Sequence, residues 1–136
     1  MKDLQYNIVR EIYISEDDHI LTFICNLGGQ KSYITEGDCC SETWFADIIG
    51  VENLLEAMVE QIRENFEIHH PENDGRCRQE VDSIYSYTLR TKKGDCDIIF
   101  RNSSNGYYGG SIISLPVAQD VTRMIRITED WQACGN

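Results

Sequence analysis

Two adjacent cysteines, Cys39 and Cys40, are the residues whose side chains could most readily act as a nucleophile. A cysteine nucleophile needs a lowered thiol pKa, supplied by a helix N-terminus or a cationic neighbour, and usually a histidine base. The pair lies among acids instead, with Asp38 directly before it and Glu42 shortly after it. Because nearby negative charge opposes formation of a thiolate, the sequence predicts no catalytic site here.

The same cysteines, together with the histidines, could also serve as zinc ligands. Structural zinc takes four ligands, commonly from closely spaced pairs of cysteine or histidine. The nearest approach to such a set is His69 and His70 with Cys77. Adjacent cysteines on a strand point to opposite faces and chelate poorly. We therefore predict no metal and no cofactor, and an enzyme or metal protein built on these residues is the least favoured of three hypotheses.

The stretch RNSSNGYYGG at residues 101–110 carries a second set of candidate side chains. Tyrosines could stack on a ligand, an arginine could supply a cation, and glycine N–H groups could form a cradle. This set suits a nucleotide-like ligand or a protein partner. Its residues are Arg101, Asn102, Asn105, Tyr107 and Tyr108. The competing interpretation is structural, because Asn-Gly at 105–106 is a strong hairpin signal in which tyrosines pack against glycines.

Net charge is the strongest global property of the sequence. The chain has 23 acidic and 12 basic residues, a formal net charge of −11. Such a surface repels phosphate backbones and anionic lipids, which argues against direct binding of nucleic acid or membrane. It favours a basic partner protein, or serves only solubility. Acids are frequent between Glu36 and Glu67, where Arg63 is the only base.

The apolar spacing between residues 51 and 66 predicts an amphipathic helix. Apolar side chains recur there at three- and four-residue steps, from Val51 to Phe66. A second stripe at four-residue spacing consists of Glu52, Glu56, Glu60 and Glu64. Like charges at that spacing repel in a helix, so this stripe has a stability cost. It is either a solvated helix face or the surface that binds the basic partner.

Alternating apolar residues predict strands in most of the remaining chain. The segments with this pattern are residues 7–14, 20–27 and 30–36 as a meander, then 81–91, 97–103, the return after residue 106, and 122–128. The expected fold is α+β and β-rich, with antiparallel meander sheets of about six to eight strands and one helix near residues 51–66. We expect a single domain over residues 1–136.

No segment reaches the ~18–20 consecutive apolar residues of a membrane span. The first residues, MKDLQYNIVREIYISEDDH, lack the apolar stretch of a signal peptide. The sequence therefore predicts a cytoplasmic protein. In that reducing compartment the six cysteines are expected to be free thiols, which are commonly small buried apolar residues.

Two segments, GDCCSETWF at 37–45 and FRNSSNGYYGGS at 100–111, resemble a domain-of-unknown-function family of small proteins found largely in bacteriophages and mobile elements. The resemblance extends over most of residues 20–113. It implies a viral or mobile-element setting and a β-rich fold, and it carries no established chemistry. Similar sequences have a strand where this chain reads MVEQIRENFEI, so helix and strand both stay open for residues 57–67. GDCCSETWF is then expected to turn one strand into the next, with one cysteine and Trp44 or Phe45 in the core.

Two functional hypotheses precede the enzyme hypothesis. The preferred one is a non-enzymatic phage or mobile-element binding protein, such as a host-defence inhibitor, whose acidic surface occupies a basic host protein. The Glu36–Glu67 segment would be its contact face. The alternative is a protein that binds or sequesters a nucleotide-like small molecule through Arg101 and the neighbouring tyrosines.

Overall fold

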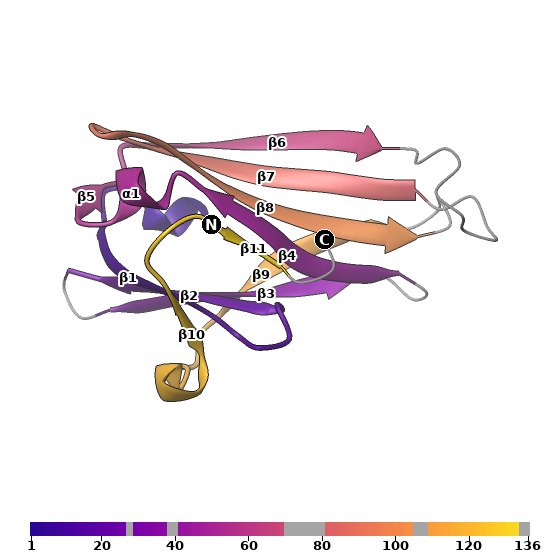
Figure 1. Cartoon of the computed structure of the whole chain (residues 1–136), viewed down its shortest axis with the longest axis horizontal. Coiled ribbons are helices and arrows are strands. Elements are labelled where there is room, and N and C mark those ends of the chain that lie inside the picture. The colour runs from indigo at the N-terminus through magenta and orange to yellow at the C-terminus, as the bar shows by residue number, and fades with distance from the viewer. Residues whose placement is uncertain (27–28, 38–40, 70–80, 105–108, 134–136) are drawn as a thin grey trace.

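The structure is a computed structural model that describes residues 1–26, 29–37, 41–69, 81–104 and 109–133 (Figure 1). These residues form eleven strands and three short helices. The strands are β1 (Ile8–Ile14), β2 (Ile20–Cys25), β3 (Gln30–Gly37), β4 (Glu42–Ile49), β5 (Ala57–Met58), β6 (Gln61–His69), β7 (Val81–Thr91), β8 (Gly94–Ser104), β9 (Gly110–Leu115), β10 (Ile125–Ile127) and β11 (Trp131–Gln132). The helices are η1 (Lys2–Leu4), α1 (Val51–Leu54) and η2 (Val121–Arg123).

The first sheet has the strand order β10-β1-β2-β3-β9, and β5 pairs with the start of β1. Its strands β1, β2 and β3 are consecutive antiparallel neighbours, which confirms the predicted three-strand meander. Alternation along β2 places Leu21, Phe23 and Cys25 together in the buried core.

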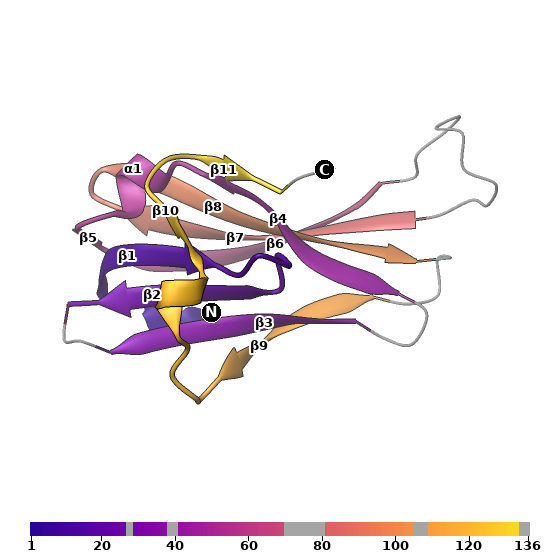
Figure 2. The ribbon, with the colours of Figure 1, turned by 60° about the horizontal axis from the view of Figure 1, so that its bottom comes forward.

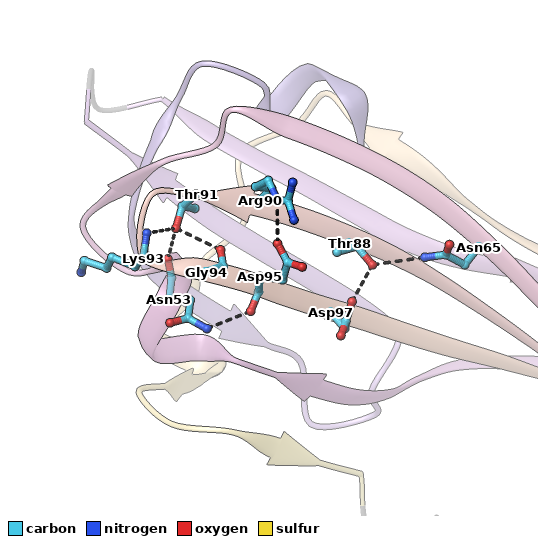
Figure 3. Close-up of polar contacts among 9 residues, drawn as sticks. All are labelled: Asn53, Asn65, Thr88, Arg90, Thr91, Lys93, Gly94, Asp95 and Asp97. Carbon is cyan, nitrogen blue, oxygen red and sulfur yellow. Dashed lines mark hydrogen bonds and ion pairs between the residues drawn. The ribbon is translucent and has the colours of Figure 1, made fainter.

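The second sheet has the order β11-β4-β8-β7-β6 and is antiparallel throughout. The strands predicted at 81–91 and 97–103 lie at its centre, joined by a tight turn at residues 92–93. The Thr91 hydroxyl fastens this turn, because it accepts a hydrogen bond from the Lys93 N–H (3.1 Å) and lies 3.2 Å from the Gly94 carbonyl oxygen (Figure 3). Gly94 has a φ of +136°, which L side chains rarely adopt.

The two sheets pack face to face around one apolar core (Figure 1 and Figure 2). Phe23 and Tyr33 meet edge to face in the first sheet, with ring centroids 6.0 Å apart. Phe45 and Phe100 do the same in the second sheet, at 6.3 Å. Phe45 is fully buried, so it is the core residue expected from GDCCSETWF. Burial of each such ring stabilises the fold by roughly 1.5–3 kcal/mol.

The predicted helix over residues 51–66 is wrong beyond Leu54. The helix α1 ends there, Leu55 is extended, and Glu56 has a positive φ of 60°, after which β5 and β6 follow. The strand alternative for residues 57–67 is the correct one. A helix would repeat like charges at every fourth residue, whereas β6 pairs with β7 along its whole length. Long-range pairing therefore overrides the local apolar spacing.

The predicted hairpin around residues 105–106 is also wrong, although those two residues themselves lie outside the described ones. The strand β9 pairs with β3 in the other sheet, not with β8. Both sides of β8 are already occupied by β4 and β7, so no edge of β8 is left for β9. The β8–β9 link therefore crosses between sheets. The short strands β5, β10 and β11 take the strand number above the predicted six to eight.

Candidate functional site

Three neighbouring strands, β6, β7 and β8, place a row of aromatic rings on the inner face of the second sheet. Phe66 is paired with Tyr85, and Tyr85 is paired with Phe100. Directly paired residues share a face of the sheet, so their side chains meet. The ring centroids of Phe66 and Tyr85 are 5.0 Å apart, and Tyr85 stacks on Phe100 at 4.8 Å and 7°. Tyr87 extends the row, 6.2 Å from Phe100.

This row runs from the core to the surface. Phe100 is only 3% exposed, whereas Phe66 on the edge strand β6 is 57% exposed. A hollow of about 350 Å³ lies along the rings. Its lining residues are Glu64, Asn65, Phe66, Tyr85, Ser86, Tyr87 and Phe100. We call this hollow the aromatic groove.

The aromatic groove contains one carboxylate, that of Glu64. Glu64 is paired with Tyr87 across β6 and β7, so both side chains project from the same face. Burial, together with the charge of Glu64 and a hydrogen bond to it, raises the pKa of Tyr87 to about 12. Tyr87 is protonated at neutral pH, as any tyrosine is, and its hydroxyl donates the hydrogen bond that orients the Glu64 carboxylate at the aromatic surface. A carboxylate beside aromatic faces is an arrangement that binds cations.

A second hollow adjoins the groove at the hydroxyl of Tyr85. That hydroxyl accepts a hydrogen bond from the Gly110 N–H (3.2 Å) at the start of β9. On the glycine side lies an open hollow of about 500 Å³. Its lining residues are Glu36, Gly37, Gly109, Gly110 and Ser111. We call it the glycine hollow, and the end of β3 and the start of β9 form it.

Gly37 and Gly110 mark the point where the two sheets touch. A Cβ atom on Gly110 would lie 2.4 Å from the Thr43 hydroxyl oxygen, and one on Gly37 would lie 2.8 Å from it. Only glycine permits this approach. Beneath the two glycines, the Asn102 amide donates a hydrogen bond to the Thr43 hydroxyl (2.8 Å). Asn102 is fully buried, so it serves to join strands β4 and β8 rather than to face a ligand.

Residues 3–114 match the family described as Domain of unknown function (DUF7448). The chain belongs to this family. No curated protein and no solved structure matches the chain. In the described part of this DUF7448 chain, no helix is long and apolar enough to cross a membrane.

The predicted ligand-binding residues do not form one site where the structure describes them. Arg101 and Asn102 are consecutive in β8, so their side chains point to opposite faces of the sheet. Arg101 is paired with Trp44 on the outer face, while Asn102 is buried between the sheets. Asn105, Tyr107 and Tyr108 lie outside the described residues.

The predicted partner-binding glutamates do not form a stripe. Two of them lie in α1 and β6 and two in the connections before and after β5, and all of them are exposed: Glu52, Glu56, Glu60 and Glu64. Glu52 in α1 lines a different hollow with Glu129 and Asp130. Glu64 is the one that reaches the aromatic groove. The structure thus separates the acids that helical spacing would align.

The cysteines that the structure describes are structural. Cys25 and Cys96 are free and buried. Burial raises the pKa of Cys96 to about 12 and also raises that of Cys25, which makes both thiols poor nucleophiles. Cys39 and Cys40 lie outside the described residues. Within the described ranges, no group of three or more His, Cys, Asp or Glu side chains is placed to hold a metal ion.

Sequence reasoning missed Phe66, Tyr85, Tyr87 and Phe100 as functional residues. The alternation in residues 81–91 predicted the strand that carries both tyrosines, but Phe66 was assigned to a helix. The available signal was the even spacing of Ile62, Phe66 and Ile68, which fits one face of a strand.

Proposed function

We propose that this protein is a non-enzymatic binding protein whose aromatic groove receives a cationic side chain from a basic partner protein. The observation that carries the proposal is the Glu64 carboxylate held in one hollow with the exposed ring of Phe66 and the half-buried ring of Tyr87. In the phage or mobile-element setting implied by the sequence motifs, the partner is a basic host protein in the host cytoplasm. Occupying the basic surface of such a protein would inhibit it, as a host-defence inhibitor does.

Two physical effects support a cationic partner. An arginine or lysine over an aromatic face gains about 0.5–2 kcal/mol, and a neighbouring carboxylate adds to that attraction. The formal net charge of −11 attracts basic proteins over distances longer than a contact and speeds association at low salt. The same charge repels nucleic acid and anionic lipid, so the proposal includes no direct binding to either.

A titration with arginine-rich peptides tests the proposal. We expect a fluorescently labelled arginine-rich peptide to bind at low salt and to weaken as salt screens the charges. Glu64→Gln should reduce affinity about fivefold, equivalent to ~1 kcal/mol. The matched control is Glu67→Gln, because Glu67 is exposed on the same strand but projects from its opposite face. Equal losses in both variants would show that only overall charge matters and would overturn the proposal.

A second pair of variants tests the aromatic part. Phe66→Ala should lower peptide affinity about tenfold, because exposed aromatic side chains often dominate binding energy. Ile49→Ala is the control, since Ile49 is 48% exposed, similar to Phe66 at 57%, and lies on β4 away from the groove. Binding unchanged in Phe66→Ala would contradict a role for the groove.

A second candidate function is binding of a nucleotide-like small molecule. The glycine hollow favours it, because its volume of about 500 Å³ and its glycine backbone could accept a small ligand. A thermal-shift panel of nucleotides separates the two candidates. A ligand at a hundred times its dissociation constant stabilises a protein by ~2.7 kcal/mol and should visibly raise the melting temperature. No shift across the panel would reject this candidate and leave the first.

A further inference from the structure

The edge strand β6 has an open side directly beside the aromatic groove. Among the described strands, only β7 pairs with β6, over the nine pairs from Gln61 to His69. A strand at a sheet edge presents backbone N–H and C=O groups that can pair with another chain. Which residues of β6 present these groups follows from the pairing of β7.

The β7–β8 turn fixes the direction of the hydrogen bonds in this part of the sheet. Thr91 and Gly94 are paired at the two ends of a two-residue turn. The two residues that flank such a turn form the hydrogen-bonded pair that closes it. Antiparallel pairs alternate between bonded and non-bonded. Residues 83, 85, 87, 89 and 91 therefore bond to β8, and the residues between them bond to β6.

The same alternation then applies to β6. Its pairs with β7 show no shift in register, so the backbone groups of Gln61, Arg63 and Asn65 point to β7. Those of Ile62, Glu64 and Phe66 point outward, to the open side. Glu64 and Phe66 are also the β6 residues whose side chains project into the aromatic groove. One stretch of strand thus offers free backbone bonding groups, a carboxylate and an aromatic ring together.

We propose that the basic partner binds by adding an extended segment to β6 as a further strand of the second sheet. This inference rests on the proposed function and specifies the form of the partner. In such a pairing, the partner residues opposite Glu64 and Phe66 project from the same face as those two side chains. The residue opposite Glu64 is basic and the residue opposite Phe66 is aliphatic or aromatic. The recognised segment is therefore extended and carries a cationic and an apolar side chain two positions apart, on the same face of the strand.

The open edge of the first sheet, β9, is less suitable. It has six residues against the nine of β6, and Pro116 follows its last residue. Its Gly110 N–H already donates to Tyr85. A second copy of the chain is also a poor occupant for β6, because each copy carries a formal charge of −11.

Amide hydrogen exchange, measured residue by residue with NMR, tests strand addition. The probe is a capped peptide with the repeat Arg-Ser-Val-Ser, which places arginine and valine two positions apart on one face of an extended strand. We expect the amides of Glu64 and Phe66 to exchange quickly in the free protein and at least about tenfold more slowly with saturating peptide. The amides of Arg63 and Asn65 bond to β7 in both states and should change little.

The outcomes separate this inference from the proposed function. If the peptide binds and the variant pairs behave as expected, but Glu64 and Phe66 amides exchange as before, strand addition is wrong and groove binding stands. If the peptide does not bind at all, both are wrong. If these amides are protected without peptide, in proportion to protein concentration, a second copy occupies β6 and the inference is overturned.

Methylated peptides give an independent check. N-methylation of the peptide residues opposite Glu64 and Phe66 would remove the N–H groups that face β6 and should abolish binding. N-methylation of the peptide residues between them should leave affinity within about twofold, because the N–H groups of those residues face solvent. Equal affinity of both methylated peptides would contradict strand addition.

Discussion

The two faces of strands β6, β7 and β8 have opposite characters. On the outer face, polar side chains bond to one another, as Figure 3 shows. The Asn65 amide donates to the Thr88 hydroxyl (3.1 Å), and that hydroxyl donates to the Asp97 carboxylate (2.5 Å). Arg90 pairs with Asp95 at 3.3 Å. On the inner face, the aromatic rings extend past the core to the exposed Phe66.

This difference indicates that the outer face contributes to stability, whereas the aromatic groove on the inner face is available to bind a partner. Polar groups that bond to each other within the sheet have little capacity left for a ligand. The Phe66 ring packs on Tyr85, but it is 57% exposed beside an oriented carboxylate, and this exposed part is buried only when something binds. Variants of the outer face should therefore change stability without changing binding, and variants at the rim of the groove should do the reverse.

The largest expected effect is at the inner end of the groove. Phe100→Ala removes a ring that is 3% exposed and packs on Tyr85 and Phe45. We expect a loss of about 3–5 kcal/mol in the free energy of unfolding, measured by urea titration. Phe66→Ala, in the same row but exposed, should cost less than about 1 kcal/mol. Similar losses in both variants would show that the row is not graded from core to surface.

Thr88→Val tests the outer face. The substitution keeps the shape of a side chain that is 7% exposed but removes the hydroxyl that bonds to Asn65 and Asp97. We expect the free energy of unfolding to fall by about 1–2 kcal/mol, with peptide affinity unchanged. A tenfold loss of peptide affinity in a folded Thr88→Val protein would contradict the separation of the two faces.

Alkaline titration tests the environment of Tyr87. Its pKa is raised from 10.0 to about 12, mainly by burial and then by Glu64. Because the folded-state pKa is the higher one, the stability contributed by the neutral hydroxyl is complete below pH 10 and is lost as pH rises from about 10 to 12. Tyr87→Phe should flatten the dependence of the urea midpoint on pH in that window. An unchanged slope would show that Tyr87 titrates normally.

The smallest effect is expected at the exposed ion pair of Arg90 and Asp95. Their side chains are 62% and 42% exposed. Solvent screens such a pair, so Arg90→Ala should change the free energy of unfolding by no more than ~0.5 kcal/mol. A change above about 1.5 kcal/mol would show that this part of the outer face is more tightly coupled than its exposure indicates.

Local sequence patterns predicted the elements whose partners are close in sequence. The meander β1–β3 and the strands β7 and β8 follow from alternating apolar residues between short turns. The aromatic groove could not be predicted in this way, because Phe66 meets Tyr85 only through the register of two strands joined by a long segment. The apolar spacing from Val51 to Phe66 favours a helix, and the pairing of β6 with β7 overrides it.

The pairing of β9 with β3 could not be predicted from local sequence either. Asn-Gly at residues 105–106 matches the sequence pattern of a hairpin between β8 and β9. Such a hairpin needs a free edge on β8, and β4 and β7 occupy both edges. Gly110 of the same motif instead allows close contact between the sheets, where it lies over Thr43.

The most direct test of the central claim is to locate the bound arginine-rich peptide by NMR. We expect the largest chemical-shift changes on titration in the ring signals of Phe66, Tyr85 and Tyr87. The side chain of Trp44, on the outer face of β4, serves as an internal control and should not move. Shifts concentrated at Trp44, or at the acidic hollow of Glu52, Glu129 and Asp130 with the groove unchanged, would contradict the assignment of the aromatic groove as the binding site.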